Sequence, residues 1–309
     1  MDAALGLSGL FGAMATPFGA DEDRTIDVKQ TEALITRMDT AGVQGIVTLG
    51  SSGEFMSMTN AERMRFTEIV ESATAETSLQ TVVHVGAMTT AEAVQLSRHA
   101  EAHGAAAVMA VTPYYEVLTI RETEEYVKAI ADSIGIPVML YHIPGCTGRK
   151  WTFDELQRLG QIDGVQYVKD SSGDFPLLVE LIEASEQGGI TPFCGYDTLM
   201  LGALANGVTG AVWGATNVIP ELCVGLFDAV IRDNDLTAAK ELWRVIHPIG
   251  NFFLQNGYLA SLKAGADIAG IAHSDPRLPM LPLTPEEKQQ LAAHVEPALA
   301  RTAGLGALR

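Results

Sequence analysis

The stretch VQYVKDSSGD, residues 165–174, joins an apolar run to a cluster of turn-forming residues. The apolar part is continuous rather than alternating, which is typical of a parallel strand that is covered on both faces. A lysine, Lys169, lies where the run ends. Similar short runs recur along the chain, and segments with helical periodicity lie between most of them. The stretch is therefore one copy of a repeated strand–helix pattern.

The number and spacing of these runs predict the fold. They cover residues 10–18, 45–54, 79–87, 105–115, 136–145, 165–173, 190–197 and 208–217. Eight strand–helix units with short connections predict an α/β protein, a (β/α)8 TIM barrel. A doubly wound open sheet is the alternative, although no G-x-G-x-x-G follows the first run. After residue 217 the pattern is wholly helical, so we expect a catalytic barrel over residues 1–232 and a C-terminal helical extension over residues 233–309.

Composition and charge exclude several classes of protein. Hydrophobic residues make up 47% of the 309 and charged residues 19%, which allows a sizeable core. The net charge of −18, with no basic patch, argues against a nucleic-acid partner. The sequence predicts no membrane span and no signal peptide. Its three cysteines form no C-x-x-C pair, so we expect neither a disulfide framework nor a cysteine zinc site, which fits a cytoplasmic protein.

Active sites of such barrels lie at the carboxyl-terminal ends of the strands, here called the barrel mouth. Two histidines, His84 and His142, could face it, but without a carboxylate between them they are more typical of packing than of a metal site. We therefore expect no metal there. The residues that end the runs are rich in hydroxyl groups and contain one lysine; they include Thr16, Ser51, Ser52, Tyr115, Tyr141, Lys169, Gly195, Asp197 and Trp213.

Position alone leaves two interpretations of Lys169. It could form a salt bridge with a neighbour such as Asp170, or it could be a nucleophile that forms a Schiff base. The second role needs a neutral amine, which an apolar barrel mouth favours over the ammonium. Tyr141 ends the preceding run, so we expect it beside Lys169, where its phenol could transfer protons. The small residues of the loop at 50–53 could hold a carboxylate through backbone N–H groups and hydroxyls.

Several motifs occur in an order and spacing that resembles the dihydrodipicolinate synthase / N-acetylneuraminate lyase family. The resemblance covers residues 8–295, nearly the whole chain. Each motif alone is modest, but the ordered set is specific. The motifs are TPF (16–18), GSSGEF (50–55), TPYY (112–115), YHIPGCTG (141–148), YVKDSSGD (167–174), GYD (195–197) and TNVIPEL (216–222).

The resemblance implies a class I aldolase with a C-terminal helical domain. Members of the family bind or release pyruvate through a lysine Schiff base, need no metal or organic cofactor, and are usually homotetramers built as a dimer of dimers. By position, Lys169 would form the imine and Tyr141 would transfer protons. Ser51 would link Tyr141 to Tyr115 of a neighbouring subunit.

Further positions are carried over as parts of the substrate site. Ser51 and Ser52 would hold the pyruvate carboxylate, and Gly195 and Val212 would border the pyruvyl end. Thr16 and Asp197 also belong to the expected binding residues.

Departures from the family pattern bear on the second substrate. The synthase branch has a carboxylate-binding arginine where this chain has Cys146, and a thiol cannot replace that charged fork. In the lyase branch an acid follows the aspartate, whereas Thr198 follows Asp197 here. Trp213 is bulky where smaller residues are usual, and we expect it to reshape the distal part of the pocket.

These departures favour a lyase that cleaves or dehydrates a 2-keto-3-deoxy sugar acid or a similar 2-oxo acid. Two alternatives remain open at the level of sequence. One is the synthase that condenses pyruvate with aspartate semialdehyde. The other is a non-catalytic barrel that binds a sugar acid or pyruvate.

Overall fold

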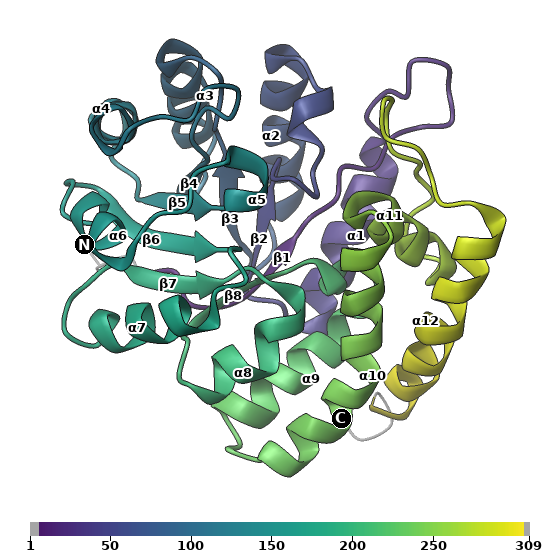
Figure 1. Ribbon diagram of the computed structural model, residues 1–309. Helices are drawn as coiled ribbons and strands as arrows, with labels where there is room; N and C mark the ends of the chain where they lie inside the picture. The colour runs from purple at the N-terminus through teal and green to yellow at the C-terminus, as the bar shows by residue number, and fades with distance from the viewer. Residues whose placement is uncertain (1–5, 306–309) are drawn as a thin grey trace.

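The computed structural model describes residues 6–305, which form a closed barrel surrounded by helices (Figure 1). All strands are parallel and follow chain order, and β8 pairs with β1. The predicted barrel is therefore confirmed, and the open sheet is wrong. The strands are β1 (Gly9–Ala13), β2 (Gly45–Thr48), β3 (Gln80–His84), β4 (Ala107–Ala110), β5 (Val138–His142), β6 (Val165–Asp170), β7 (Thr191–Cys194) and β8 (Gly210–Trp213).

Most strands end before the apolar runs do, because the remaining residues of each run form the loops of the barrel mouth. Helices follow these loops. They are α1 (Val28–Ala41), α2 (Asn60–Thr74), α3 (Thr90–Ala102), α4 (Ile120–Ala131), α5 (Pro144–Thr147), α6 (Phe153–Leu159), α7 (Phe175–Ser185), α8 (Met200–Ala205), α9 (Pro220–Ile231), α10 (Leu236–Gln255), α11 (Tyr258–Ile268) and α12 (Pro285–Leu305). Short 3₁₀ turns η1 (Phe55–Ser57), η2 (Asp197–Leu199) and η3 (Gly214–Asn217) follow β2, β7 and β8.

Three helices of the ring begin with the same local device. A threonine caps each of α2, α4 and α6, and a glutamate three residues later returns a hydrogen bond to the backbone of the cap. This capping box satisfies N–H groups that a helix otherwise leaves unpaired. The chain can therefore leave a strand, cross the mouth and enter a helix within a few residues.

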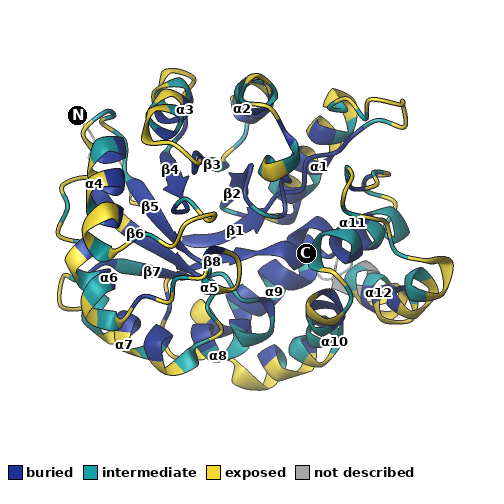
Figure 2. Cartoon of the chain, turned by 45° about the horizontal axis from the view of Figure 1, so that its top comes forward, coloured by how far each residue is buried: buried dark blue, intermediate teal, exposed yellow. Residues whose placement is uncertain are grey.

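The core has an inner and an outer layer. Figure 2 shows the strands almost wholly buried, while the helices expose their outward faces. Successive side chains of a strand point to opposite faces. On β3, for example, Val82 packs inside the barrel and Val83 packs against the helices. This alternation decides which residues at a strand end can reach the mouth.

The C-terminal helices α10, α11 and α12 pack against one another beside the barrel, and α10 also packs on α9. The start of α11 lies against η3, so Tyr258 comes close to the end of β8; a Cβ atom at Gly214 would meet its hydroxyl. The boundary at residues 232 and 233 stays a prediction, and the outermost residues of both predicted regions, 1–5 and 306–309, lie outside the described ones. None of the helices within residues 6–305 combines the length and hydrophobicity that a membrane crossing requires.

Candidate active site

Lys169 and Tyr141 lie side by side at the barrel mouth. They are direct partners in the register of β5 and β6, so both side chains point to the inside of the barrel. Lys169 is only 6% exposed, and its Nζ lies 4.1 Å from the centroid of the Tyr141 ring. The phenol is thus held next to the amine, as the two neighbouring strand ends predicted.

Asp170 is not the partner of Lys169. It is the next residue of β6 and points to the outer layer, where its Oδ1 lies 2.8 Å from His142 Nδ1. The His142 Nε2 accepts the backbone N–H of Trp151 at 3.2 Å, so the proton of a neutral ring is on Nδ1 and is donated to Asp170. The ring also stacks on Trp151, with centroids 5.2 Å apart. His142 therefore has a structural place outside the mouth.

The loop after β2 brings its hydroxyl groups to this pair. Ser51 Oγ lies 3.4 Å from the Tyr141 hydroxyl. Thr16 donates a hydrogen bond to the Gly53 carbonyl at 2.7 Å, so its hydroxyl holds the loop after β2 in place. A Cβ atom at Gly53 would lie 2.7 Å from the backbone nitrogen of Leu49, which explains why a glycine is needed here.

Gly195 leaves the space that Lys169 occupies. A Cβ atom at this position would lie 2.8 Å from Lys169 Cε and 2.5 Å from Ser171 Oγ. Val212 is buried in the inner layer, on the strand next to β7. Gly195 therefore lies against Lys169, Val212 lies in the inner layer of the barrel, and their expected role at the pyruvyl end stays a prediction.

Asp197 and Tyr258 form a polar pair beside the lysine. The Tyr258 hydroxyl donates to Asp197 Oδ2 at 2.8 Å, while Oδ1 is buried without a hydrogen-bond partner among the described residues. Burial raises the pKa of Asp197 to about 6, and the bond from Tyr258 and the charge of Lys169 oppose this rise. Burial and Asp197 also raise the pKa of Tyr258 well above its usual value, whereas the Ser52 hydroxyl lowers it.

Sequence reasoning missed Tyr258. It lies at the first position of α11, far along the chain from every motif of the mouth, and no local pattern marks it. Only the packing of the C-terminal helices on the barrel brings its phenol to Asp197.

His84 is the second polar group that sequence reasoning left without a role. It lies on the inner face of β3 and is 1% exposed, and neither ring nitrogen has a hydrogen-bond partner among residues 6–305. Its ring lies 4.5 Å from that of Phe55 and 6.3 Å from that of Tyr141. Burial, and then the charges of Arg63 and Lys169, lower its pKa well below the usual value, so the ring is neutral.

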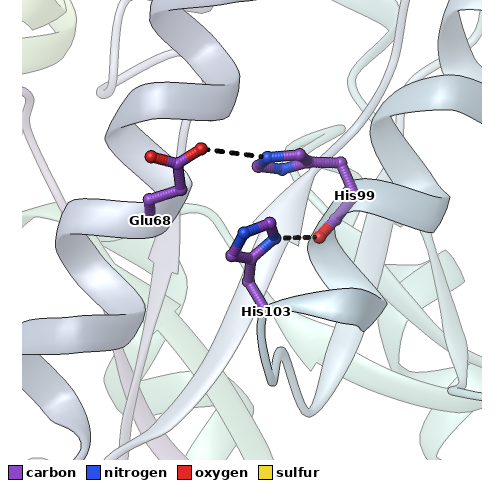
Figure 3. A group of neighbouring side chains, drawn as sticks. All are labelled: Glu68, His99 and His103. Atoms are coloured by element: carbon purple, nitrogen blue, oxygen red, sulfur yellow. Dashed lines mark hydrogen bonds and ion pairs between the residues drawn. The ribbon is translucent and has the colours of Figure 1, made fainter.

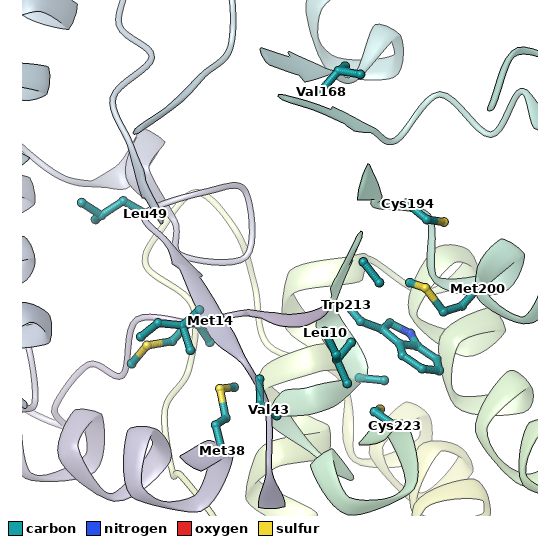
Figure 4. Close-up of a cluster of buried hydrophobic side chains, with 14 of the residues drawn as sticks. Leu10, Met14, Met38, Val43, Leu49, Val168, Cys194, Met200, Trp213 and Cys223 are labelled. Carbon is teal, nitrogen blue, oxygen red and sulfur yellow. The ribbon is translucent and has the colours of Figure 1, made fainter. Parts of the chain in front are cut away.

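The structure does not bring Trp213 to the mouth. Val212 takes the inward position of β8, so the next side chain points outward and packs near Met200 and Cys223 (Figure 4). The Trp213 ring lies 6.1 Å from that of Trp243 on α10. The expectation that Trp213 reshapes the pocket is therefore wrong for this chain, because alternation along the strand was not visible in a continuous apolar run.

Two further predicted residues lie at the surface. Tyr115 is 86% exposed in the loop after β4, away from the Ser51–Tyr141 contact of its own chain. Cys146 is exposed on α5, and partial burial of its thiol raises the pKa, which keeps it neutral.

A parallel barrel with a buried lysine and a phenol side by side at its mouth is the arrangement of an aldolase-type lyase of class I, and the comparisons with known proteins place the chain in this class. The chain belongs to the dihydrodipicolinate synthetase family, whose model matches residues 6–298. Enzymes of this family form a lysine Schiff base with pyruvate and use neither a metal nor another cofactor.

Relatives within the family carry different activities in their names. A probable 2-dehydro-3-deoxy-D-pentonate aldolase of Escherichia coli is 31% identical over 85% of this chain and 88% of its own length. A 4-hydroxy-tetrahydrodipicolinate synthase of Natronomonas pharaonis is 30% identical over 92% of this chain and 95% of its own length.

Solved structures agree with the fold. A putative dihydrodipicolinate synthetase from Pseudomonas aeruginosa has a TM-score of 0.89 at 32% identity and covers 95% of this chain and all of its own. YagE of Escherichia coli, solved in complex with pyruvate, has a TM-score of 0.88 at 27% identity, with 94% and 98% covered.

Proposed function

We propose that this lyase acts on a 2-keto-3-deoxy sugar acid or a similar 2-oxo acid through an imine on Lys169. The observation that carries the proposal is the buried carboxyl group of Asp197, whose Oδ1 has no hydrogen bond of full geometry among residues 6–305 and whose pKa responds to the charge of Lys169. A buried acceptor of this kind needs a hydrogen bond from its ligand. A sugar hydroxyl supplies one, whereas the apolar end of a smaller keto acid does not.

The chemistry follows from the positions of Lys169 and Tyr141. The amine of Lys169 attacks the C2 carbonyl, and loss of water gives the imine. In aldol cleavage, Tyr141 removes the proton of the C4 hydroxyl, the C3–C4 bond breaks, and its electron pair moves toward the iminium. An aldehyde leaves, and the enamine is protonated at C3 and hydrolysed to pyruvate. In dehydration, the same imine acidifies C3, and a hydroxyl leaves as water.

The residues after β5 argue against an acidic aldehyde as the second substrate. Cys146 has no positive charge to offer a carboxylate. The next two cations are Arg149, which pairs with Glu155, and Lys150, which pairs with Asp174 at 2.8 Å. With these two cations paired, hydroxyl and carboxyl groups at the mouth, such as those of Ser51 and Asp197, are the partners that we expect for substrate hydroxyls. The aldolase name of the Escherichia coli relative supports the same substrate class.

Reductive trapping tests the imine. Incubation with pyruvate and borohydride should add one pyruvyl unit to the chain, and peptide mapping should find it on Lys169. Lys169→Ala should give no adduct, whereas Lys150→Ala, a control at an exposed lysine near the mouth, should give the wild-type yield. An adduct on another lysine would contradict the assignment of Lys169 as the residue that forms the imine.

A substrate panel tests the class of substrate separately. Five- and six-carbon 2-keto-3-deoxy acids should be turned over faster than the condensation of pyruvate with aspartate semialdehyde. Efficient use of the semialdehyde would instead support the synthase activity that other relatives carry in their names. Trapping without turnover of any panel member would point to a binding protein.

We propose that Tyr115 completes the site of a neighbouring subunit in a homotetramer. Its loop is rich in exposed apolar side chains, with Tyr114 41% and Val117 54% exposed, and Met88 from the loop after β3 is also exposed. Clusters of this kind mark protein contacts. They support an assembly in which Tyr115 reaches the Ser51–Tyr141 pair of the partner.

Subunit mixing tests this arrangement. Lys169→Ala and Tyr115→Phe chains should each be impaired alone. When they are unfolded and refolded together, mixed assemblies should regain activity, because the Tyr115→Phe subunit keeps its own Lys169 and receives Tyr115 from its partner. Failure to regain activity in assemblies shown to be mixed would contradict the shared site.

A further inference from the structure

A second group of polar side chains lies outside the barrel, between two helices of the ring. Glu68 comes from α2, and His99 and His103 come from the last turn and the C-cap of α3 (Figure 3). Each offers one possible ligand atom, and these atoms all lie within 4.8 Å of one another. Nothing in the aldolase chemistry uses them, because they are on the helices and not at the barrel mouth.

The two histidines are one helical turn apart, so their rings share a face of α3. The ring centroids lie 4.1 Å apart, and His99 Nε2 lies 3.4 Å from Glu68 Oε1. The spacing of four residues is the one by which a helix presents two imidazoles to a single metal ion. A carboxylate from the neighbouring helix adds a third ligand.

Hydrogen bonds around the cluster prepare it for a cation. His103 Nδ1 lies 2.8 Å from the His99 carbonyl oxygen, which can only accept, so this nitrogen carries the proton. The lone pair of a neutral His103 is then on Nε2 and free to bind. A bond of this kind from the second ring nitrogen is the usual support of a metal-binding histidine. Arg65 Nη1 donates a hydrogen bond to Glu68 Oε2 at 3.0 Å, so the other carboxylate oxygen, Oε1, points toward His99.

We propose that Glu68, His99 and His103 bind a divalent transition metal of the zinc type and thereby tie α2 to α3. Two imidazoles and one carboxylate are a donor set that suits Zn²⁺, whereas Mg²⁺ and Ca²⁺ prefer oxygen ligands alone. His103 is exposed and Glu68 is partly exposed, so small side-chain rotations can bring the three atoms to bonding distance. A water molecule takes the fourth position.

Metal binding to the folded state alone raises stability by mass action. The three ligands come from two consecutive helices, so the ion would stabilise the outer contact of α2 with α3 and not the imine site. This inference is therefore independent of the proposed function.

Calorimetric titration of chelator-treated protein with Zn²⁺ tests the site. We expect one Zn²⁺ per chain, with affinity at least about 10-fold weaker in Glu68→Gln, His99→Ala and His103→Ala. His273→Ala, which removes an exposed histidine elsewhere on the surface, is the matched control and should bind as the wild type does. Circular dichroism should give the same spectrum for all variants, because the changed side chains are exposed or partly exposed and lie outside the buried core.

Two further readouts identify the metal environment. Co²⁺ in place of Zn²⁺ should give the visible absorption of a tetrahedral site in wild type but not in the His99→Ala/His103→Ala double variant. Zn²⁺, but not Mg²⁺, should raise the melting temperature of wild type and His273→Ala but not of the double variant, and chelation should leave keto-acid turnover unchanged. Equal Zn²⁺ affinity in all variants, no binding, or loss of binding only in His273→Ala would each overturn the proposal.

Discussion

Two buried lysines of this protein, Lys169 at the barrel mouth and Lys263 on α11, have the same kind of surroundings but different partners. Lys263 is 3% exposed and Lys169 6%, and the Nζ atom of each lies over an aromatic ring, at 4.3 Å from the Phe18 centroid and 4.1 Å from that of Tyr141. Lys263, however, forms an ion pair with the fully buried Glu54 and hydrogen bonds to Ser274 and Asp275.

The difference explains how one fold can keep one lysine inert and another available. Burial lowers the pKa of Lys263 to about 8, and Glu54 opposes this by favouring the charged form. A charged lysine that donates hydrogen bonds to a carboxylate and to two other oxygen atoms has no lone pair with which to attack a carbonyl. Within residues 6–305 no carboxylate pairs with Lys169, because Asp170 points outward to His142. Burial without an ion pair therefore distinguishes the proposed nucleophile.

The largest expected effect is on turnover. Lys169→Ala should lower kcat by at least about 10³-fold, since the covalent step is lost. Its free energy of unfolding should stay within about 1 kcal/mol of wild type, since no ion pair is broken. Steady-state kinetics and urea unfolding measure both quantities. If the variant keeps its turnover, Lys169 is not the nucleophile. The functional difference between Lys169 and Lys263 would then be contradicted as well.

Tyr141→Phe should have the next largest effect. Loss of a proton-transfer group slows turnover by about 10²–10⁴-fold. Borohydride trapping of pyruvate should persist more than turnover does, because the amine is still present. Single-turnover kinetics with a keto acid separates the two steps, and wild-type rates in this variant would show that the phenol beside Lys169 is only a packing group.

Lys263→Met should affect stability instead of chemistry. Removing one partner of a buried pair leaves Glu54 as an uncompensated charge, which costs about 3–5 kcal/mol. Urea unfolding should detect this loss, and the added change Glu54→Gln should recover part of it. A Lys263→Met variant as stable as wild type would mean that the pair is not structural.

The smallest effect is a shift in pH dependence. An ionised Asp197 accepts a hydrogen bond from a substrate hydroxyl more strongly than a protonated one, so kcat/KM should have an acidic limb near pH 6. Asp197→Asn should remove this limb. Tyr258→Phe should move it to higher pH, because the bond from Tyr258 lowers the pKa of Asp197. A limb that is the same in all three proteins would exclude Asp197 from substrate binding.

The same raised pKa has a consequence for folding. The folded chain binds the Asp197 proton more tightly than the unfolded chain, in which the carboxyl group has its usual pKa of 3.8. The contribution of protonated Asp197 to the free energy of unfolding is therefore greatest below pH 3.8. It is lost as the pH rises through the folded-state pKa of about 6. Urea unfolding of wild type and Asp197→Asn over this range measures the difference.

Much of the architecture could be predicted from local patterns. Each apolar run contains a strand, and Lys169 and Tyr141 are neighbours because β5 and β6 are consecutive in the chain and in the barrel. The ends of the strands were less predictable. A run such as 208–217 stays apolar beyond Trp213, since the following 3₁₀ turn is also buried.

By itself, the sequence determined the number of strand–helix units and the position of Lys169 at a strand end, since both follow from the period of apolar segments, and it favoured a closed barrel over an open sheet. Only the tertiary structure decided which side of a strand each residue faces and which distant groups meet at the mouth. The sequence did not show that Val212 faces the inside of the barrel while Trp213 faces the helices, because both faces of a parallel strand are apolar. Tyr258 reaches Asp197 because α11 packs against the end of β8, and no local sequence pattern records that contact.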